Sequence, residues 1–113
     1  MIILKEQVTV QYLNELAQNF YGEMIKAVAD VDKGLIALDA ELHSDLEWML
    51  LENGSSQESL WGFNIYPQLD GDDFVEFDSL INIRPRQNNR SRDVENPAIR
   101  EEILSLVGKF IKK

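Results

Sequence analysis

The chain has 113 residues, a length typical of one domain. Hydrophobic residues make up 44% and charged residues 27%, a composition that argues against a disordered chain. The absence of cysteine excludes disulfides, thiolate zinc sites and a cysteine nucleophile, and the net charge of −9 argues against non-specific binding to nucleic acid or to an anionic membrane.

The N-terminal part of the chain predicts a short strand followed by a helix. Ile2, Ile3 and Leu4 form a brief apolar run that suits a strand. Thr9 is a suitable N-cap, and apolar residues recur at the helical period after it until Gly22, which is placed to end the helix. The opening run is too short and too soon charged for a signal peptide, so the predicted location is the cytoplasm.

A hairpin and a second helix are predicted next. Residues 24–31 and 35–38 are rich in apolar residues and flank Asp32-Lys33-Gly34, which is a typical hairpin turn. A helix over Ala40–Asn53 is predicted because Leu42, Leu46, Met49 and Leu50 recur at helical spacing and Gly54 follows as a stop.

The second half of the chain predicts another pair of strands and a last helix. The strands are Leu60–Tyr66 and Phe74–Arg84, joined by Pro67–Asp73. Asn96-Pro97 supplies an N-cap and a proline at the first helical position. The order β-α-β-β-α-β-β-α predicts a single α+β domain over residues 1–113, with a largely antiparallel or mixed sheet and about three helices packed on one face.

The predicted strands of the second pair separate an apolar face from a polar one. Trp61, Phe63 and Ile65 alternate with polar residues, as expected for a strand covered on one side. The polar set consists of Asn64, Tyr66, Glu76, Asp78, Asn82 and Arg84. We expect this set to face solvent, a ligand or another subunit. Two asparagines within strands are disfavoured by propensity and need a specific role.

Residues 84–92 carry four arginines and no acid, whereas residues 70–78 carry five acids and no base. One interpretation of the connection Pro85–Asn96 is an anion clamp, because guanidinium groups match phosphate and carboxylate oxygens. The other is that the arginines bind the acidic segment, within the chain or across a dimer. Nucleic-acid recognition ranks below both, since the loop has no interleaved aromatic residues. The predicted ligand-binding residues are Asn64, Tyr66, Asn82, Arg84, Arg86, Asn89, Arg90 and Arg92.

The only histidine, His43, lies four residues before Glu47 on the second predicted helix. The pair could act as an acid and base, or as two metal ligands completed by Asp39 or Asp45. Acidic residues also suit the start of a helix electrostatically, and a lone histidine is more often structural. We therefore predict neither a metal site nor a cofactor.

Several motifs together resemble a known family. They are Glu41–Glu47, Gly54–Gln57, Leu60–Pro67, Ser79–Pro85 and Asn89–Ser91. They resemble a small prokaryotic family of conserved hypothetical proteins that is classed as a domain of unknown function. The resemblance covers nearly the whole chain and implies a stand-alone cytoplasmic protein of one domain. It implies no activity, cofactor, partner or site residue.

The predicted function is a non-enzymatic binding or interaction module, expected to be a homodimer. Its polar sheet face and arginine-rich loop would meet an anionic ligand or an acidic partner surface. The alternative is a small hydrolase or phosphoryl-processing enzyme. In that case His43 would act as acid and base, Glu47 would orient it or bind a metal, and Arg84 and Arg90 would stabilise developing negative charge.

Overall fold

A hairpin of two apolar strands lies at the centre of the computed structural model, which describes residues 1–113. Strands β3 (Ile25–Asp30) and β4 (Leu35–Leu38) pair antiparallel around the predicted turn. The buried carboxylate of Asp30 holds this turn, because its Oδ1 accepts hydrogen bonds from the main-chain N–H groups of Asp32 and Lys33, both at 2.9 Å. The hairpin prediction is confirmed.

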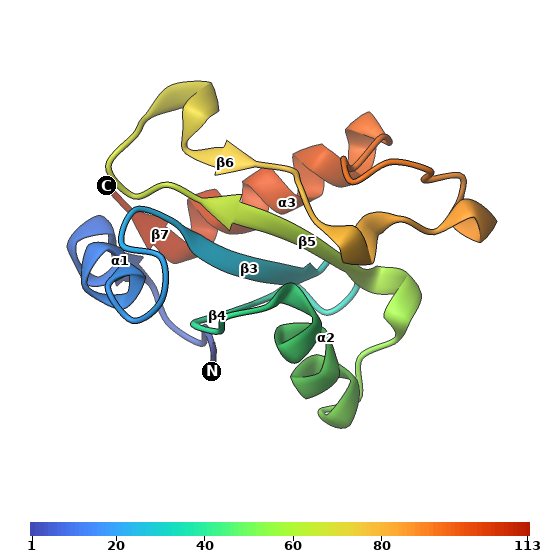
Figure 1. Cartoon of the computed structure of the whole chain (residues 1–113), viewed down its shortest axis with the longest axis horizontal. Coiled ribbons are helices and arrows are strands. Elements are labelled where there is room, and N and C mark those ends of the chain that lie inside the picture. Colours follow the sequence, from blue (N-terminus) through green and yellow to red (C-terminus); the bar gives the residue numbers. More distant parts are fainter.

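The hairpin is extended on both sides into a five-stranded antiparallel sheet with the order β1-β4-β3-β5-β6 (Figure 1). The added strands are β1 (Ile2–Ile3), β5 (Leu60–Ile65) and β6 (Val75–Glu76). A separate parallel pair joins β2 (Val8–Thr9) to β7 (Ile111–Lys112). The predicted α+β class with a largely antiparallel sheet is therefore confirmed.

Three helices pack against this sheet: α1 (Val10–Ala17), α2 (His43–Glu52) and α3 (Pro97–Phe110). The predicted caps of the first and last helices are present, because the side chains of Thr9 and Asn96 accept hydrogen bonds from Tyr12 N and Ala98 N. Helix α2 differs, since its N-cap residue Leu42 provides no side-chain cap. None of the helices is both long and apolar enough to span a membrane.

The helices cover both faces of the sheet, which corrects the prediction that all three lie on one. Helices α1 and α3 share a hydrophobic core with Ala27 and Ala29 of β3. Helix α2 packs on the opposite face, where it shares a smaller core with Val28 of β3 and Ala37 of β4 (Figure 1). The physical reason is visible in β3 and β4, whose successive residues are apolar rather than alternating, a pattern typical of strands buried on both faces.

The predicted strand Phe74–Arg84 is wrong in its length, because only Val75–Glu76 pairs with β5 as a strand. The chain then turns through a short 3-10 segment at Leu80–Asn82. Side chains continue the pairing along β5. The amide of Asn82 accepts from Gly62 N at 2.8 Å and donates to Gly62 O at 2.9 Å, and Arg84 donates from Nη2 to Leu60 O. These side chains take the place of the missing strand.

Gly62 is required where this segment crosses β5. A Cβ atom at Gly62 would lie 2.6 Å from Ser79 Oγ and 2.7 Å from Ser79 Cβ, closer than packed atoms can approach. The absence of a side chain lets the segment after β6 lie directly against the strand.

We expect Gly62→Ala to lower the free energy of unfolding by about 1–3 kcal/mol, because the added methyl group overpacks a buried contact. Gly108→Ala is the matched control, since a Cβ there meets no atom within 4 Å and replaces glycine inside α3. That change should stabilise the protein by about 0.5–1 kcal/mol. Urea unfolding of both variants measures the difference. Equal stabilities of the two variants would contradict the close contact at Gly62.

Candidate functional site

A cleft of about 480 Å³ opens between the N-terminus of α2 and the edge formed by β5, β6 and the segment after β6. We call it the α2–β5 cleft. Its polar lining residues are Lys26, His43, Ser44, Asn64, Tyr66, Glu76, Asp78, Ser79 and Arg92. They come from separate parts of the sequence and meet only because α2 packs on this face of the sheet.

The floor of the cleft is a row of polar residues that crosses three adjacent strands. Lys26 of β3 lies opposite Asn64 of β5, which in turn lies opposite Glu76 of β6. Asn64 Nδ2 donates to Glu76 Oε1 at 2.9 Å, and Tyr66 Oη donates to the same oxygen at 3.0 Å. The row therefore runs from a cation through an amide to a carboxylate.

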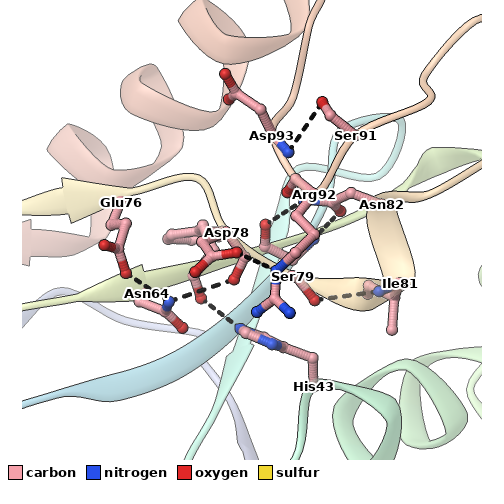
Figure 2. Close-up of polar contacts among 12 residues, drawn as sticks. His43, Asn64, Glu76, Asp78, Ser79, Ile81, Asn82, Ser91, Arg92 and Asp93 are labelled. Carbon is pink, nitrogen blue, oxygen red and sulfur yellow. Dashed lines mark hydrogen bonds and ion pairs between the residues drawn. The ribbon is translucent and has the colours of Figure 1, made fainter.

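Asn64 leaves one buried oxygen without a partner. Its Nδ2 contacts two atoms that can only accept, Glu76 Oε1 and the main-chain oxygen of Asp78, the latter at 3.3 Å. These contacts fix the orientation of the amide, so Oδ1 points away from them and toward His43 (Figure 2). Asn64 is only 4% exposed, yet its Oδ1 accepts no hydrogen bond. A buried acceptor of this kind is rare in proteins and suggests a missing donor.

His43 anchors α2 to the central sheet. Its Nε2 lies 2.8 Å from Phe63 O, and because a carbonyl oxygen only accepts, Nε2 must carry the proton. Burial lowers the pKa of His43 to about 4, against an opposing contribution from the hydrogen bond to Phe63. The imidazole is therefore neutral at neutral pH, with Nδ1 unprotonated. This agrees with the structural role considered for a lone histidine.

Hydrogen-bond donors border the cleft on two sides. Because no side chain caps α2, the leading main-chain N–H groups of His43 and Ser44 have no acceptor within the helix. Opposite them, Arg92 forms an ion pair through Nε with Asp78 Oδ1. The terminal nitrogens of Arg92 make no hydrogen bond within the chain and extend toward the cleft (Figure 2).

Three of the predicted ligand-binding residues, Asn64, Tyr66 and Arg92, lie together in this cleft with His43. Two others, Asn82 and Asn89, are buried and bonded inside the protein. Asn89 donates from Nδ2 to Asn82 O and Asp93 O, and its Oδ1 accepts from Glu95 N. Their side chains give the connection after β6 its shape, which is why asparagine occurs there.

The guanidinium of Arg84 is also hydrogen-bonded within the protein. It donates to the main-chain oxygens of Gln57 and Leu60 and to Gln87 Oε1, and it stacks over the Trp61 ring at 4.2 Å. Burial lowers its pKa. Arg84 lines a second, more open hollow of about 800 Å³ together with Arg86, apart from the α2–β5 cleft.

Arg90 lies on a turn whose main-chain donors already hold a carboxylate. Glu95 Oε2 accepts from Arg90 N and Ser91 N at 2.9 Å each, and from Ser91 Oγ at 2.7 Å. These hydrogen bonds lower the pKa of Glu95. An anion approaching this turn would meet the carboxylate that the chain itself provides.

His43 and Glu47 do not form one site. His43 faces β5, whereas Glu47 lies near Arg84 and Gln57, and burial raises the pKa of Glu47. No three histidine, aspartate or glutamate side chains converge to hold a metal ion, so the pair gains no further ligand from Asp39 or Asp45.

Lys26 and Ser44 also line the cleft, although neither is among the predicted ligand-binding residues. Lys26 had a recognisable signal, because it is the only cation within the otherwise apolar strand run 25–29. Ser44 had none, since a serine near the start of a helix is ordinary.

We expect the protein to lose stability on acidification because the unfolded chain protonates His43 more readily than the folded one. With a folded pKa of about 4 against an ordinary 6.5, this stability is present above about pH 6.5 and is lost as the pH falls toward 4. Between about pH 7 and pH 4.5 the loss should reach about 2 kcal/mol. Urea unfolding at the two pH values measures it.

His43→Gln is the control, because a glutamine amide can still donate to Phe63 O but does not titrate. Carboxylates titrate in both proteins, so the difference between their pH dependences isolates His43. An identical loss in the variant would contradict a buried neutral imidazole.

The comparisons with known proteins identify a family whose description states no activity. A family model described as "Protein of unknown function (DUF5674)" matches residues 2–110. No curated protein and no solved structure matches the chain. Because the match covers nearly all of the sequence that builds the sheet, the helices and the cleft, the chain belongs to the DUF5674 family.

Proposed function

We propose that this protein is a binding module that holds a small anionic molecule in the α2–β5 cleft. The observation that carries the proposal is the meeting of Arg92, Lys26 and the uncapped N-terminus of α2 in one cleft, although the chain as a whole carries a charge of −9. A guanidinium can bind two anion oxygens at once, and helix N-terminal N–H groups favour anions.

Binding is favoured over catalysis by the state of His43. At neutral pH its imidazole has no proton to give from Nδ1, its Nε2 proton is bound to Phe63 O, and its low pKa makes it a weak base. The enzyme alternative needs His43, Glu47, Arg84 and Arg90 together. Only His43 lines the cleft.

Two aspects of the cleft restrict the anion to a small molecule. Asp78 and Glu76 share the cleft with the cations, which disfavours a long polyanion such as nucleic acid. The cleft volume of about 480 Å³ lies in the range of small-molecule sites.

The test compares Arg92→Ala with Arg90→Ala, which removes another exposed arginine of the same connection outside the cleft. Thermal melting is followed with phosphate and with isocaproate, a simple carboxylate. At a hundredfold excess over Kd, binding stabilises the folded wild-type protein by about 2.7 kcal/mol, a shift of several degrees in Tm. We expect Arg90→Ala to keep this shift and Arg92→Ala to lose most of it.

Loss of the Arg92–Asp78 ion pair should itself cost only about 0–1 kcal/mol, because both side chains are about half exposed. The Arg92→Ala protein therefore remains folded for the comparison. The proposal fails if neither anion shifts the wild-type Tm, or if the two variants respond alike.

Self-association is a second candidate property, consistent with the homodimer expected from the sequence. Trp48 and Leu51 on the outer side of α2 are 61% and 39% exposed, and exposed tryptophan is enriched at protein interfaces. If a second copy of the chain covers them, sedimentation should show a dimer that Trp48→Gln dissociates. Phe20→Gln, at an exposed aromatic residue after α1, should leave the dimer intact. A monomeric wild-type protein would exclude this candidate.

A further inference from the structure

We infer that the ligand of the α2–β5 cleft is a zwitterion: a small molecule that carries an ammonium group and an anionic group on an apolar stem, as free aliphatic amino acids do. The inference rests on the proposed anion site and adds the ammonium group and the stem. It is carried by the charge balance of the cleft, by the unpartnered oxygen of Asn64 and by the apolar rim.

The charged residues of the cleft are balanced. Lys26 and Arg92 are cations, Glu76 and Asp78 are anions, and His43 is neutral. The ion pair between Arg92 and Asp78 uses only one oxygen of Asp78, and Glu76 uses only Oε1 in its contacts with Asn64 and Tyr66. Each carboxylate therefore keeps an oxygen that can accept. A plain anion leaves these oxygens without a donor, whereas a ligand with both charges satisfies them.

The unpartnered Oδ1 of Asn64 requires a hydrogen-bond donor. Asn64 belongs to the row that joins Lys26 to Glu76, and its side chain lies between Glu76 and His43 (Figure 2). An ionised carboxylate offers only acceptors, so a simple carboxylate cannot satisfy Asn64 Oδ1. An ammonium group has three donors, so it can donate to Asn64 Oδ1 and still offer donors to a carboxylate of the cleft.

The anionic group then has a separate place in the same cleft. The uncapped N–H groups of α2 and the terminal nitrogens of Arg92 are all donors. Donors on one wall and acceptors on the floor match the two ends of a zwitterion. This arrangement also fixes the direction in which the ligand lies.

The rim of the cleft suits an apolar stem. Leu42, before α2, and Leu80, after β6, both line the cleft and are 48% and 67% exposed. Met24 and Ile81 add further apolar surface to the lining. An aliphatic side chain placed here would cover leucine surface that is otherwise in contact with water.

The test uses three related probes in isothermal titration calorimetry. Leucine carries both charged groups, isocaproate lacks only the ammonium group, and isoamylamine lacks only the carboxylate. We expect leucine to bind at least about tenfold more tightly than either partial ligand, because a hydrogen-bonded charge contributes about that factor.

Glu76→Gln tests the contact with the ammonium group without disturbing the fold. A glutamine oxygen can still accept from Asn64 Nδ2 and Tyr66 Oη, so the floor keeps its hydrogen bonds and loses only its charge. Leucine should bind this variant about tenfold more weakly, while isocaproate binding is retained. Glu102→Gln, on the exposed side of α3, makes the same change in net charge and should leave leucine binding unchanged.

The outcomes distinguish this inference from the proposed function. If isocaproate binds as tightly as leucine, the zwitterion is excluded and the anion site stands. If isoamylamine binds as tightly as leucine, the cleft is a cation site and both ideas fail. If wild-type protein binds neither leucine, isocaproate nor phosphate, both fail as well.

Discussion

The edge of β5 that no full strand covers is the constraint on which the rest of the structure depends. This strand pairs along its whole length with β3, but β6 covers its other edge at only two residues. The remaining main-chain groups are buried and need hydrogen-bond partners. Asn82 and Arg84 provide them at Gly62 and Leu60, which obliges the segment after β6 to lie against the strand.

The same hydrogen bonds position the cleft. Asn82 Nδ2 and Ser79 N both donate to Arg92 O, each at 3.0 Å, so the segment that covers β5 also holds the main chain of Arg92. Arg92 and Asp78 are thereby brought beside Asn64, opposite the N-terminus of α2 (Figure 2). A feature required by the sheet thus supplies one wall of the candidate binding site.

Local patterns predicted much of the fold because they act over a few residues. The hairpin turn, the Thr9 and Asn96 caps and the inward face of β5 all follow from short-range chemistry. The division of helices between two faces depends on packing between distant segments. The alternation in residues 74–84 predicts a paired strand, whereas Asn82 and Arg84 pair with β5 through their side chains. Similarly, nothing local indicated that Arg92 would meet the start of α2 while Arg84 would not.

The side-chain hydrogen bonds at Gly62 affect how the protein behaves when it opens locally. If the segment after β6 detaches, the amide and carbonyl of Gly62 lose Asn82 together, and β5 becomes a partly uncovered edge strand. Uncovered edges can pair with strands of other chains and begin aggregation. Asn82 and Arg84 therefore also protect the native sheet from intermolecular strand addition, and hydrogen exchange at Gly62 N would report how often that protection is lifted.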